Sequence, residues 1–182
     1  MLIVELDERV LGDITSFLGR APKKVPIIIS RTLNRTLDMT KAEQVRRARD
    51  IYEVKSGKLR ENYRVKKSNP GNLYGEIVSS GSQIALEHFR LSSRRRSKVP
   101  LKVAVKKGGL KPLGRRAFIA YQDGHGGAFA RQGSKRIPIR RLYGLSAPQM
   151  LGEEGILEHL IGYSQEKFNE RFQHEFEREM KW

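Results

Sequence analysis

The chain has 182 residues, with 36 Lys and Arg against 20 Asp and Glu, a net charge of +16, and no cysteine. Disulfide frameworks and thiolate metal sites are therefore excluded. No apolar run approaches the roughly 18 residues of a membrane span, so we expect a soluble chain without a membrane partner. The length predicts a single domain over 1–182, and a hydrophobic content of only 38% suggests surfaces that partner subunits complete.

The positive charge is concentrated in the middle of the chain. Residues 1–20 carry a net charge of −2 and residues 153–182 one of −4, whereas residues 21–152 carry 30 basic and 8 acidic groups, a net +22. An excess of this size is typical of proteins that bind a polyanion. Two alternatives stay open: nucleic acid is the partner, or a solvated basic surface is balanced by an acidic neighbour in an assembly.

The first third of the chain predicts mainly helix. Residues 1–22 read as an N-terminal arm with a short edge strand and a short helix. Residues 25–63 form a long helical region, and Ser56 is expected to cap its last turns. A capping-box pattern at Thr40 and Glu43 leaves a break open, but we expect one long helix. Its apolar stripe has helical spacing and consists of Val25, Ile29, Leu33, Leu37, Val45, Ala48 and Tyr52.

Residues 72–142 predict an antiparallel sheet that follows a turn at 66–71. A strand is expected at 73–79, and the segment 84–91 is ambiguous between a strand and an irregular edge. Residues 101–105 alternate apolar and polar side chains with a period of two, which is the pattern of a half-buried strand.

Together with the strand at 101–105, the second half of this sheet predicts an antiparallel meander. Short apolar runs at 117–121 and 127–131 flank an Asp-Gly and Gly-Gly turn, a strong signal for a hairpin. Ile137-Pro138-Ile139 then reads as an edge strand, because a central strand would not tolerate proline.

Two basic loops belong to this sheet, at 92–98 and at 106–116. Neither has the periodicity that would anchor it in a core, so we expect both to be exposed and mobile until an anion orders them. The residues predicted to contact DNA or an acidic partner are Arg94, Arg95, Arg96, Lys98, Lys106, Lys107, Lys111, Arg115 and Arg116.

Residues 146–182 predict a long amphipathic helix that begins at a Ser146 cap followed by an early proline and is interrupted by Gly152 and Gly155. Its apolar residues fall four apart, namely Ile156, Leu160, Ser164, Phe168, Phe172, Phe176 and Met180. This stripe packs either on the helix that begins at Val25 or on a neighbouring subunit, which makes Phe168, Phe172 and Phe176 candidates for a subunit interface. The fold class is therefore α+β: an antiparallel meander packed with two long helices.

The sequence lacks the common residue patterns of catalytic sites. The histidines lack the spacing of a zinc helix, and no phosphate-binding GxxxxGK[ST] loop occurs. Carboxylates are too few beside the basic loops for a two-metal nuclease. Asp123 and His125 could form a catalytic pair, but a hairpin tip explains them equally well. We therefore expect no enzyme, no cofactor and no metal, and any DNA contact is expected to be with phosphates.

The run RRAFIAYQDGHGGAFARQGSKRIPIRRLYGLSAPQML, residues 115–151, resembles the C-terminal half of the minor tail protein Z family of phages and prophages. Members of that family have a GAFIA-like strand, a Gly-His turn, a VFVR-like strand and a closing LYGPSVPQML. Arg116 replaces a glycine of the pattern, and Leu145 to Pro148 stand for its PSVP segment. Upstream, the run from Arg31 to Thr36 is similar to an A-x-N-R-T element of the family. The likeness extends from about Val25 to the end of the sequence.

The resemblance implies a structural virion protein that completes the head-proximal end of a long non-contractile tail and contributes to head-tail joining and genome passage. It implies a homohexameric ring, with the tail terminator or tail tube, the head-tail connector and packaged double-stranded DNA as partners. The protein would be assembled in the host cytoplasm and located in the virion neck. An alternative is a monomeric module that binds DNA or RNA without reading sequence.

Overall fold

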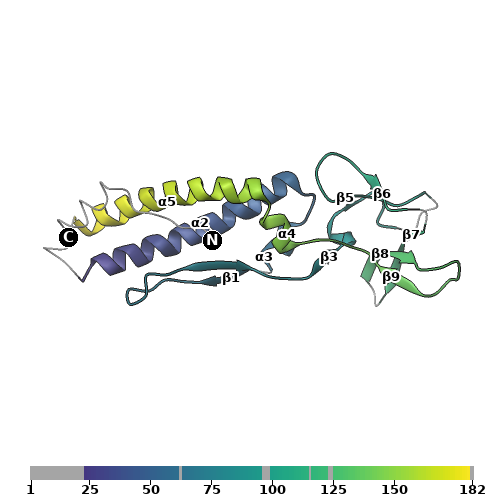
Figure 1. Cartoon of the computed structure of the whole chain (residues 1–182), viewed down its shortest axis with the longest axis horizontal. Coiled ribbons are helices and arrows are strands. Elements are labelled where there is room, and N and C mark those ends of the chain that lie inside the picture. The colour runs from purple at the N-terminus through teal and green to yellow at the C-terminus, as the bar shows by residue number, and fades with distance from the viewer. Residues whose placement is uncertain (1–22, 62, 96–98, 115, 123–124, 181–182) are drawn as a thin grey trace. The chain divides into compact units, whose positions relative to one another are not determined.

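The computed structural model describes residues 23–180 except 62, 96–98, 115 and 123–124, so the predicted N-terminal arm lies outside it. The fold is α+β, with two long helices and small antiparallel sheets, as the sequence predicts (Figure 1). Contacts within the chain group its residues into two compact units, and the single domain expected over 1–182 stays a prediction. The described part of the helical unit is 23–44, 63–78 and 153–180, and the strand unit covers 45–62 and 79–152.

The helical unit is built on α2 (Val25–Ile51) and α5 (Glu154–Met180). Helix α2 runs without the break considered near residue 38 and continues into the strand unit after Gln44. The two helices lie side by side (Figure 1) and share a core of Val25, Ile28, Phe168 and Phe172. The predicted C-terminal stripe therefore packs on helix α2 of the same chain. The rings of Phe168 and Phe172 are 6.3 Å apart and stacked.

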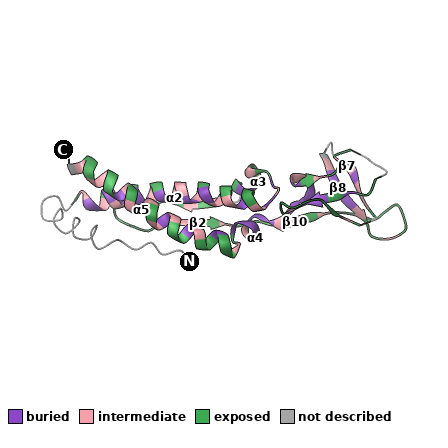
Figure 2. Ribbon diagram, turned by 90° about the horizontal axis from the view of Figure 1, so that it is seen from above, coloured by how far each residue is buried: buried purple, intermediate pink, exposed green. Residues whose placement is uncertain are grey.

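The middle of α2 differs from the predicted stripe. Thr32, Thr36 and Thr40 are buried there, while Leu33 and Leu37 are only half-buried. The side-chain hydroxyls of Thr32 and Thr36 have no hydrogen-bond partner among the described residues. Because threonine carries a methyl group that can pack at a close helix contact, the buried face of α2 includes threonine positions that hydropathy alone would not select. Figure 2 shows buried and exposed positions alternating along both helices.

A hairpin of β1 (Tyr63–Lys66) and β2 (Glu76–Ser79) lies against α2. Its turn is where the sequence predicts it, and Asn34 of α2 holds it: the Asn34 amide donates to the Ser68 carbonyl at 2.9 Å, and its oxygen accepts from the Ser68 N–H at 2.8 Å. Tyr63 donates to Gln44 at 2.7 Å, and burial raises the pKa of the Tyr63 hydroxyl. The hairpin is thus tied to α2 at both of its ends, by the Ser68 backbone at the turn and by the Tyr63 side chain at the start of β1.

In the strand unit, the predicted meander is confirmed. It consists of β7 (Ala117–Gln122), β8 (His125–Arg131) and β9 (Ile139–Arg141), with Phe118 opposite Phe129. Pro138 precedes the edge strand β9. Ile119, Ala128 and Phe129 are buried; Ile119 and its partner Ala128 lie on one face of the sheet, and Phe129 lies on the other.

The strand predicted at 101–105 is not part of that meander. It forms β5 (Lys102–Ala104), which pairs with β4 (Arg90–Leu91) and β6 (Lys111–Pro112) in a separate sheet. The ambiguous segment 84–91 resolves into β3 (Gln83–Ala85), a 3₁₀ turn η1 (Leu86–His88) and β4. Strand β3 pairs with β10 (Tyr143–Ser146). Which strands form these sheets depends on the pairing of distant segments. Local alternation of apolar and polar residues does not predict that pairing.

Two short helices, α3 (Ser56–Arg60) and α4 (Ala147–Leu151), contact each other in the strand unit. The predicted Ser146 cap is confirmed: Ser146 and Gln149 form a capping box, with Pro148 near the helix start. Ser56 is the first helical residue and not the cap, which falls on Lys55. Leu59 and Met150 are fully buried here. Among the described residues, no helix is both long and apolar enough for a membrane span.

Candidate anion-binding groove

The predicted basic residues that the structure describes all lie in the strand unit. Two follow β4, two follow β5, one lies in β6 and one precedes β7, and all are exposed: Arg94, Arg95, Lys106, Lys107, Lys111 and Arg116. Arg96, Lys98 and Arg115 lie outside the described residues, as do Asp123 and the side chain of His125. The three phenylalanines proposed for a subunit interface lie in the helical unit, where Phe168 and Phe172 are buried and Phe176 packs beside them.

The described part of the strand unit has 19 Lys and Arg but only 4 Asp and Glu. Most of these acidic side chains form ion pairs with basic residues of the same unit. Glu53 lies 3.5 Å from Arg90, Glu61 lies 2.8 Å from Lys58, and Glu87 pairs with Arg141. Most of the cations are therefore left to face solvent or a partner.

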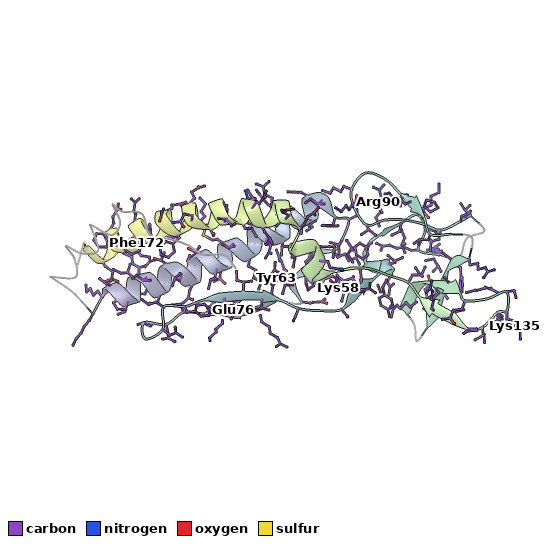
Figure 3. The ribbon with its side chains drawn as sticks, in the orientation of Figure 1. Lys58, Tyr63, Glu76, Arg90, Lys135 and Phe172 are labelled. Atoms are coloured by element: carbon purple, nitrogen blue, oxygen red, sulfur yellow. The ribbon has the colours of Figure 1, made fainter. Side chains whose placement is uncertain are left out.

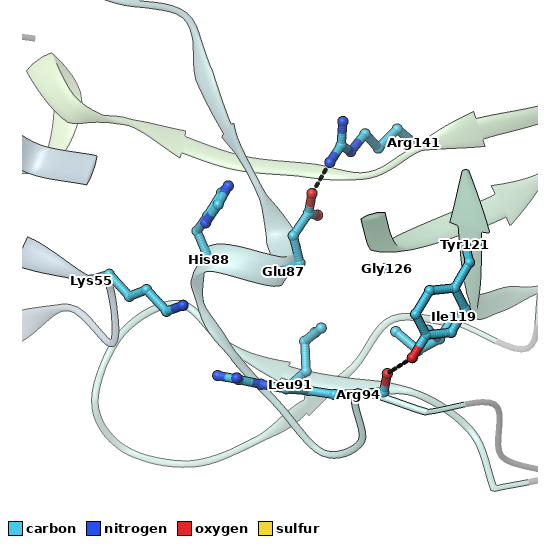
Figure 4. Close-up of a pocket in the computed structure, with 9 residues that line it drawn as sticks. All are labelled: Lys55, Glu87, His88, Leu91, Arg94, Ile119, Tyr121, Gly126 and Arg141. Atoms are coloured by element: carbon cyan, nitrogen blue, oxygen red, sulfur yellow. Dashed lines mark hydrogen bonds and ion pairs between the residues drawn. The ribbon is translucent and has the colours of Figure 1, made fainter. Parts of the chain in front are cut away.

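Two adjoining cavities, of about 410 and 490 Å³, form a groove across this unit. They share Lys55, His88, Leu91 and Arg94, and we call their combined surface the groove. Figure 4 shows Lys55, His88 and Arg94 arranged around the first cavity. The second cavity extends it to Arg49, Arg90 and Lys107. The groove thus gathers six cations and two carboxylates, and both carboxylates, Glu53 and Glu87, already have arginine partners.

Backbone contacts at the end of α2 bring the groove cations together. The Lys107 N–H donates to the Ile51 carbonyl at 2.7 Å, and the Glu53 N–H donates to the Val105 carbonyl at 2.9 Å. A bridge between Val54 and Phe89 continues this pairing. Arg49, Lys55 and Lys107 therefore line the same cavity, although they come from α2, the residue before α3 and the loop after β5.

The arginine run after β4 is held by side chains. The Arg95 N–H donates to Ser93 Oγ at 3.2 Å, and the Tyr121 hydroxyl donates to the Arg94 carbonyl at 3.2 Å (Figure 4). The sequence predicts a mobile loop here until an anion binds, whereas the backbone of Arg94 and Arg95 has partners in the chain itself. The Arg94 carbonyl therefore has a partner, while its exposed side chain lines the groove.

Tyr121 supplies an aromatic surface at the edge of the groove. It is 62% exposed and lies opposite Gly126 on the neighbouring strand. A Cβ added at Gly126 would come within 3.0 Å of Tyr121 Cε1, so the ring rests on a strand position that has no side chain. Together with the bond to Arg94, this contact fixes the ring with much of its surface open.

His88 lies at the centre of the groove as an uncharged group. Burial lowers the pKa of the imidazole, and the positive charges of Lys58, Lys55 and Arg141 lower it further, against the opposing effect of Glu87. At neutral pH, His88 can therefore donate and accept hydrogen bonds without adding to the positive charge.

The chemistry of the groove favours anion binding. Exposed guanidinium and ammonium groups bind phosphate or carboxylate oxygens by charge-assisted hydrogen bonds. Within the described residues, no group of three or more His, Asp or Glu side chains could hold a metal ion.

Only part of this site is predictable from sequence. Arg94 and Lys107 were predicted and line the groove, whereas Arg95, Lys106, Lys111 and Arg116 do not line it. The further groove residues missed by sequence reasoning include Arg49, Lys55, His88, Tyr121 and Arg141. Of these, Tyr121 could have been found from the sequence, because an aromatic residue opposite a glycine in a predicted hairpin indicates that the ring packs on the backbone. Comparisons of the chain with protein-family models, curated proteins and solved structures found no match.

Proposed function

We propose that this chain is a structural virion protein of a long-tailed phage, which completes the head-proximal end of the tail. In this proposal, copies of the chain close into a hexameric ring in the neck, next to the tail tube and the head-tail connector. The protein acts by shape and charge and without catalysis.

The observation that carries the proposal is how the family-like run folds. The residues from Ala117 to Leu151, which resemble the minor tail protein Z family, form β7, β8, β9, β10 and α4 in unbroken succession. The Ser146–Gln149 capping box opens α4, the last element of the run, and overlaps the segment from Leu145 to Pro148 that stands for the family's PSVP residues. The likeness thus covers β7 to α4, and β10 of this run pairs with β3 outside it.

The charge of the strand unit supports the same assignment. A surface with so few unpaired acids favours packaged double-stranded DNA or an acidic neighbouring ring as the facing partner, because like charge on a partner would be repelled. The basic residues proposed for this contact are those of the two predicted loops.

The first test is assembly. The purified chain is measured by light scattering and imaged by electron microscopy, alone and mixed with the tail-tube protein of the same phage. The proposal expects a closed ring of six copies and a collar position in labelled particles. A chain that stays monomeric under both conditions while binding nucleic acid would favour the alternative, a sequence-independent binding module.

The second test removes charge from the first basic loop. The variant with Arg94, Arg95 and Arg96 all replaced by Ser is expected to form rings but to give fewer DNA-filled, infectious particles. A matched control replaces Lys135 and Arg136, exposed residues of the β8–β9 connection. Normal assembly and unchanged salt-dependent retention of DNA by the triple variant would rule out a role for this loop.

A further inference from the structure

We infer that the groove of the strand unit binds a single-stranded segment of nucleic acid, with its cations on the phosphates and Tyr121 stacked on a base. This is a separate claim from ring assembly, since either can fail while the other holds. The inference uses only residues of the strand unit.

The first step is the unpaired charge. Among the described residues, no carboxylate lies within ion-pair distance of Arg49, Lys55, Arg94 or Lys107. All four are exposed and line the groove. A line of cations that the fold does not neutralise is the arrangement that follows a phosphate backbone.

The second step is the shape of the surface. The cations lie along hollows of about 410 and 490 Å³, not on a flat or convex face. A duplex is a wide convex cylinder that would contact only the rim of such hollows. An extended single strand is narrow enough to enter them, which favours a strand over a duplex.

The third step is the aromatic ring. Tyr121 is held at its hydroxyl by the Arg94 carbonyl and at its face by Gly126, and yet it is 62% exposed. Bases of a single strand stack on such rings whatever their sequence, whereas an acidic peptide has no flat group that would need one. Arg94 therefore links the aromatic platform to the cations of the groove, because its carbonyl holds the Tyr121 hydroxyl and its side chain lines the same hollow (Figure 4).

The test uses the full chain and three probes: a fluorescent oligothymidylate of roughly 15 nucleotides, in the range that one compact domain covers, a duplex of the same length, and a poly-glutamate peptide. Fluorescence anisotropy gives the affinity of each. We expect the single strand to bind most tightly, with log K falling linearly against log salt.

Variants locate the site. The double variant Lys55→Gln and Arg94→Gln is expected to reduce the salt slope by about 0.7 for each phosphate that the chain no longer neutralises. Tyr121→Leu should weaken binding about tenfold by removing the stacking surface, and Tyr121→Phe, which keeps the ring, should bind almost as the native chain does. The matched control, Lys135→Gln with Arg136→Gln, removes the same charge from the same unit but lies outside the groove.

Circular dichroism and thermal melting establish that each variant is folded, and the Lys55 and Arg94 double variant still tests the groove if Tyr121→Leu does not fold. Equal affinity for strand and duplex, tighter binding of poly-glutamate, or equal losses in the groove and control variants would each overturn the inference. So would native affinity in the Lys55 and Arg94 double variant.

Discussion

The described part of the helical unit contains 11 Lys and Arg and 11 Asp and Glu, whereas that of the strand unit contains 19 and 4. In the helical unit, charges meet within the chain: Glu179 lies 3.3 Å from Lys24 and 2.9 Å from Arg31, and its hydrogen bond to Lys24 is the main reason that its pKa is lowered. In the strand unit, three of the four described acids pair with basic residues, and the cations outnumber the acids. Among the described residues, charge is thus balanced in the helical unit and strongly positive in the strand unit, which leads us to expect an anionic partner for the strand unit.

The two units also differ in what holds them together. The helical unit has a core of large apolar side chains along two long helices, whereas the strand unit joins short strands and short helices over a core that includes Leu59, Phe89 and Met150. We therefore expect a division of work in which each core stabilises its own unit and the strand unit also supplies binding. The predictions below test that division in order of decreasing effect.

The largest effect is expected in the helical core. Phe172→Ala removes a ring that is 2% exposed and stacks between Phe168 and Phe176 (Figure 3 labels its position). Loss of a buried phenylalanine costs about 3–5 kcal/mol of unfolding free energy. Urea unfolding followed by circular dichroism measures it. His174→Ala, an exposed change on the same helix, is the control. A loss no greater than that of the control would mean that α2 and α5 do not depend on this core.

A smaller effect is expected from crowding the strand unit. In Gly144→Ala, the new Cβ would lie 2.8 Å from Cε2 of Phe89, a ring that is itself 2% exposed. Overpacking of this kind costs about 1–3 kcal/mol. The control is Gly133→Ala, where a Cβ would meet no atom within 4 Å. Similar melting temperatures for the two variants would show that β10 does not need the close approach to Phe89.

The stability of the strand unit should depend on pH through His88. Because burial and the charges of Lys58, Lys55 and Arg141, opposed by that of Glu87, hold the imidazole pKa below its ordinary value in the folded chain, the unfolded chain takes up the proton first as pH falls. Stability is therefore lost as pH drops below the unfolded value of about 6.5 and levels off once the folded imidazole is protonated too. Urea unfolding at about pH 7.5 and pH 5 should show a larger loss for the native chain than for His88→Gln. His174→Gln, at an exposed position, should behave as the native chain does, and an equal loss in His88→Gln would contradict the prediction.

The smallest effect is expected from an exposed ion pair of the helical unit. Lys167 lies 2.6 Å from Glu170 and 3.3 Å from Glu166, and its hydrogen bond to Glu170 is the main cause that raises its pKa. Exposed pairs of this kind contribute little to stability because solvent screens them. Lys167→Gln should unfold at the same urea concentration as the native chain within error. A loss like that of Gly144→Ala would show that ion pairs stabilise the helical unit, whereas the comparison of the two units attributes its stability to its apolar core.

Much of the fold is predictable because its signals are local. The long helix from Val25, the 117–131 hairpin and the Ser146 cap each follow from the spacing of a few neighbouring residues, and the structure has all three. The buried threonines of α2 and the pairing of β5 outside the meander were not predictable. Both depend on which distant segment packs against the element, and hydropathy along one segment does not carry that information.

The candidate site follows the same rule. Composition by itself determined that the middle of the chain is strongly cationic, and turn residues determined where its basic loops fall. Only the tertiary structure decided which cations act together. Lys55 and Arg94 are far apart in sequence and line the same hollow because the bridge between Val54 and Phe89 brings the segment after α2 next to the start of β4. Charge adds along a sequence whatever the fold, but a groove forms only where long-range pairing brings its walls together.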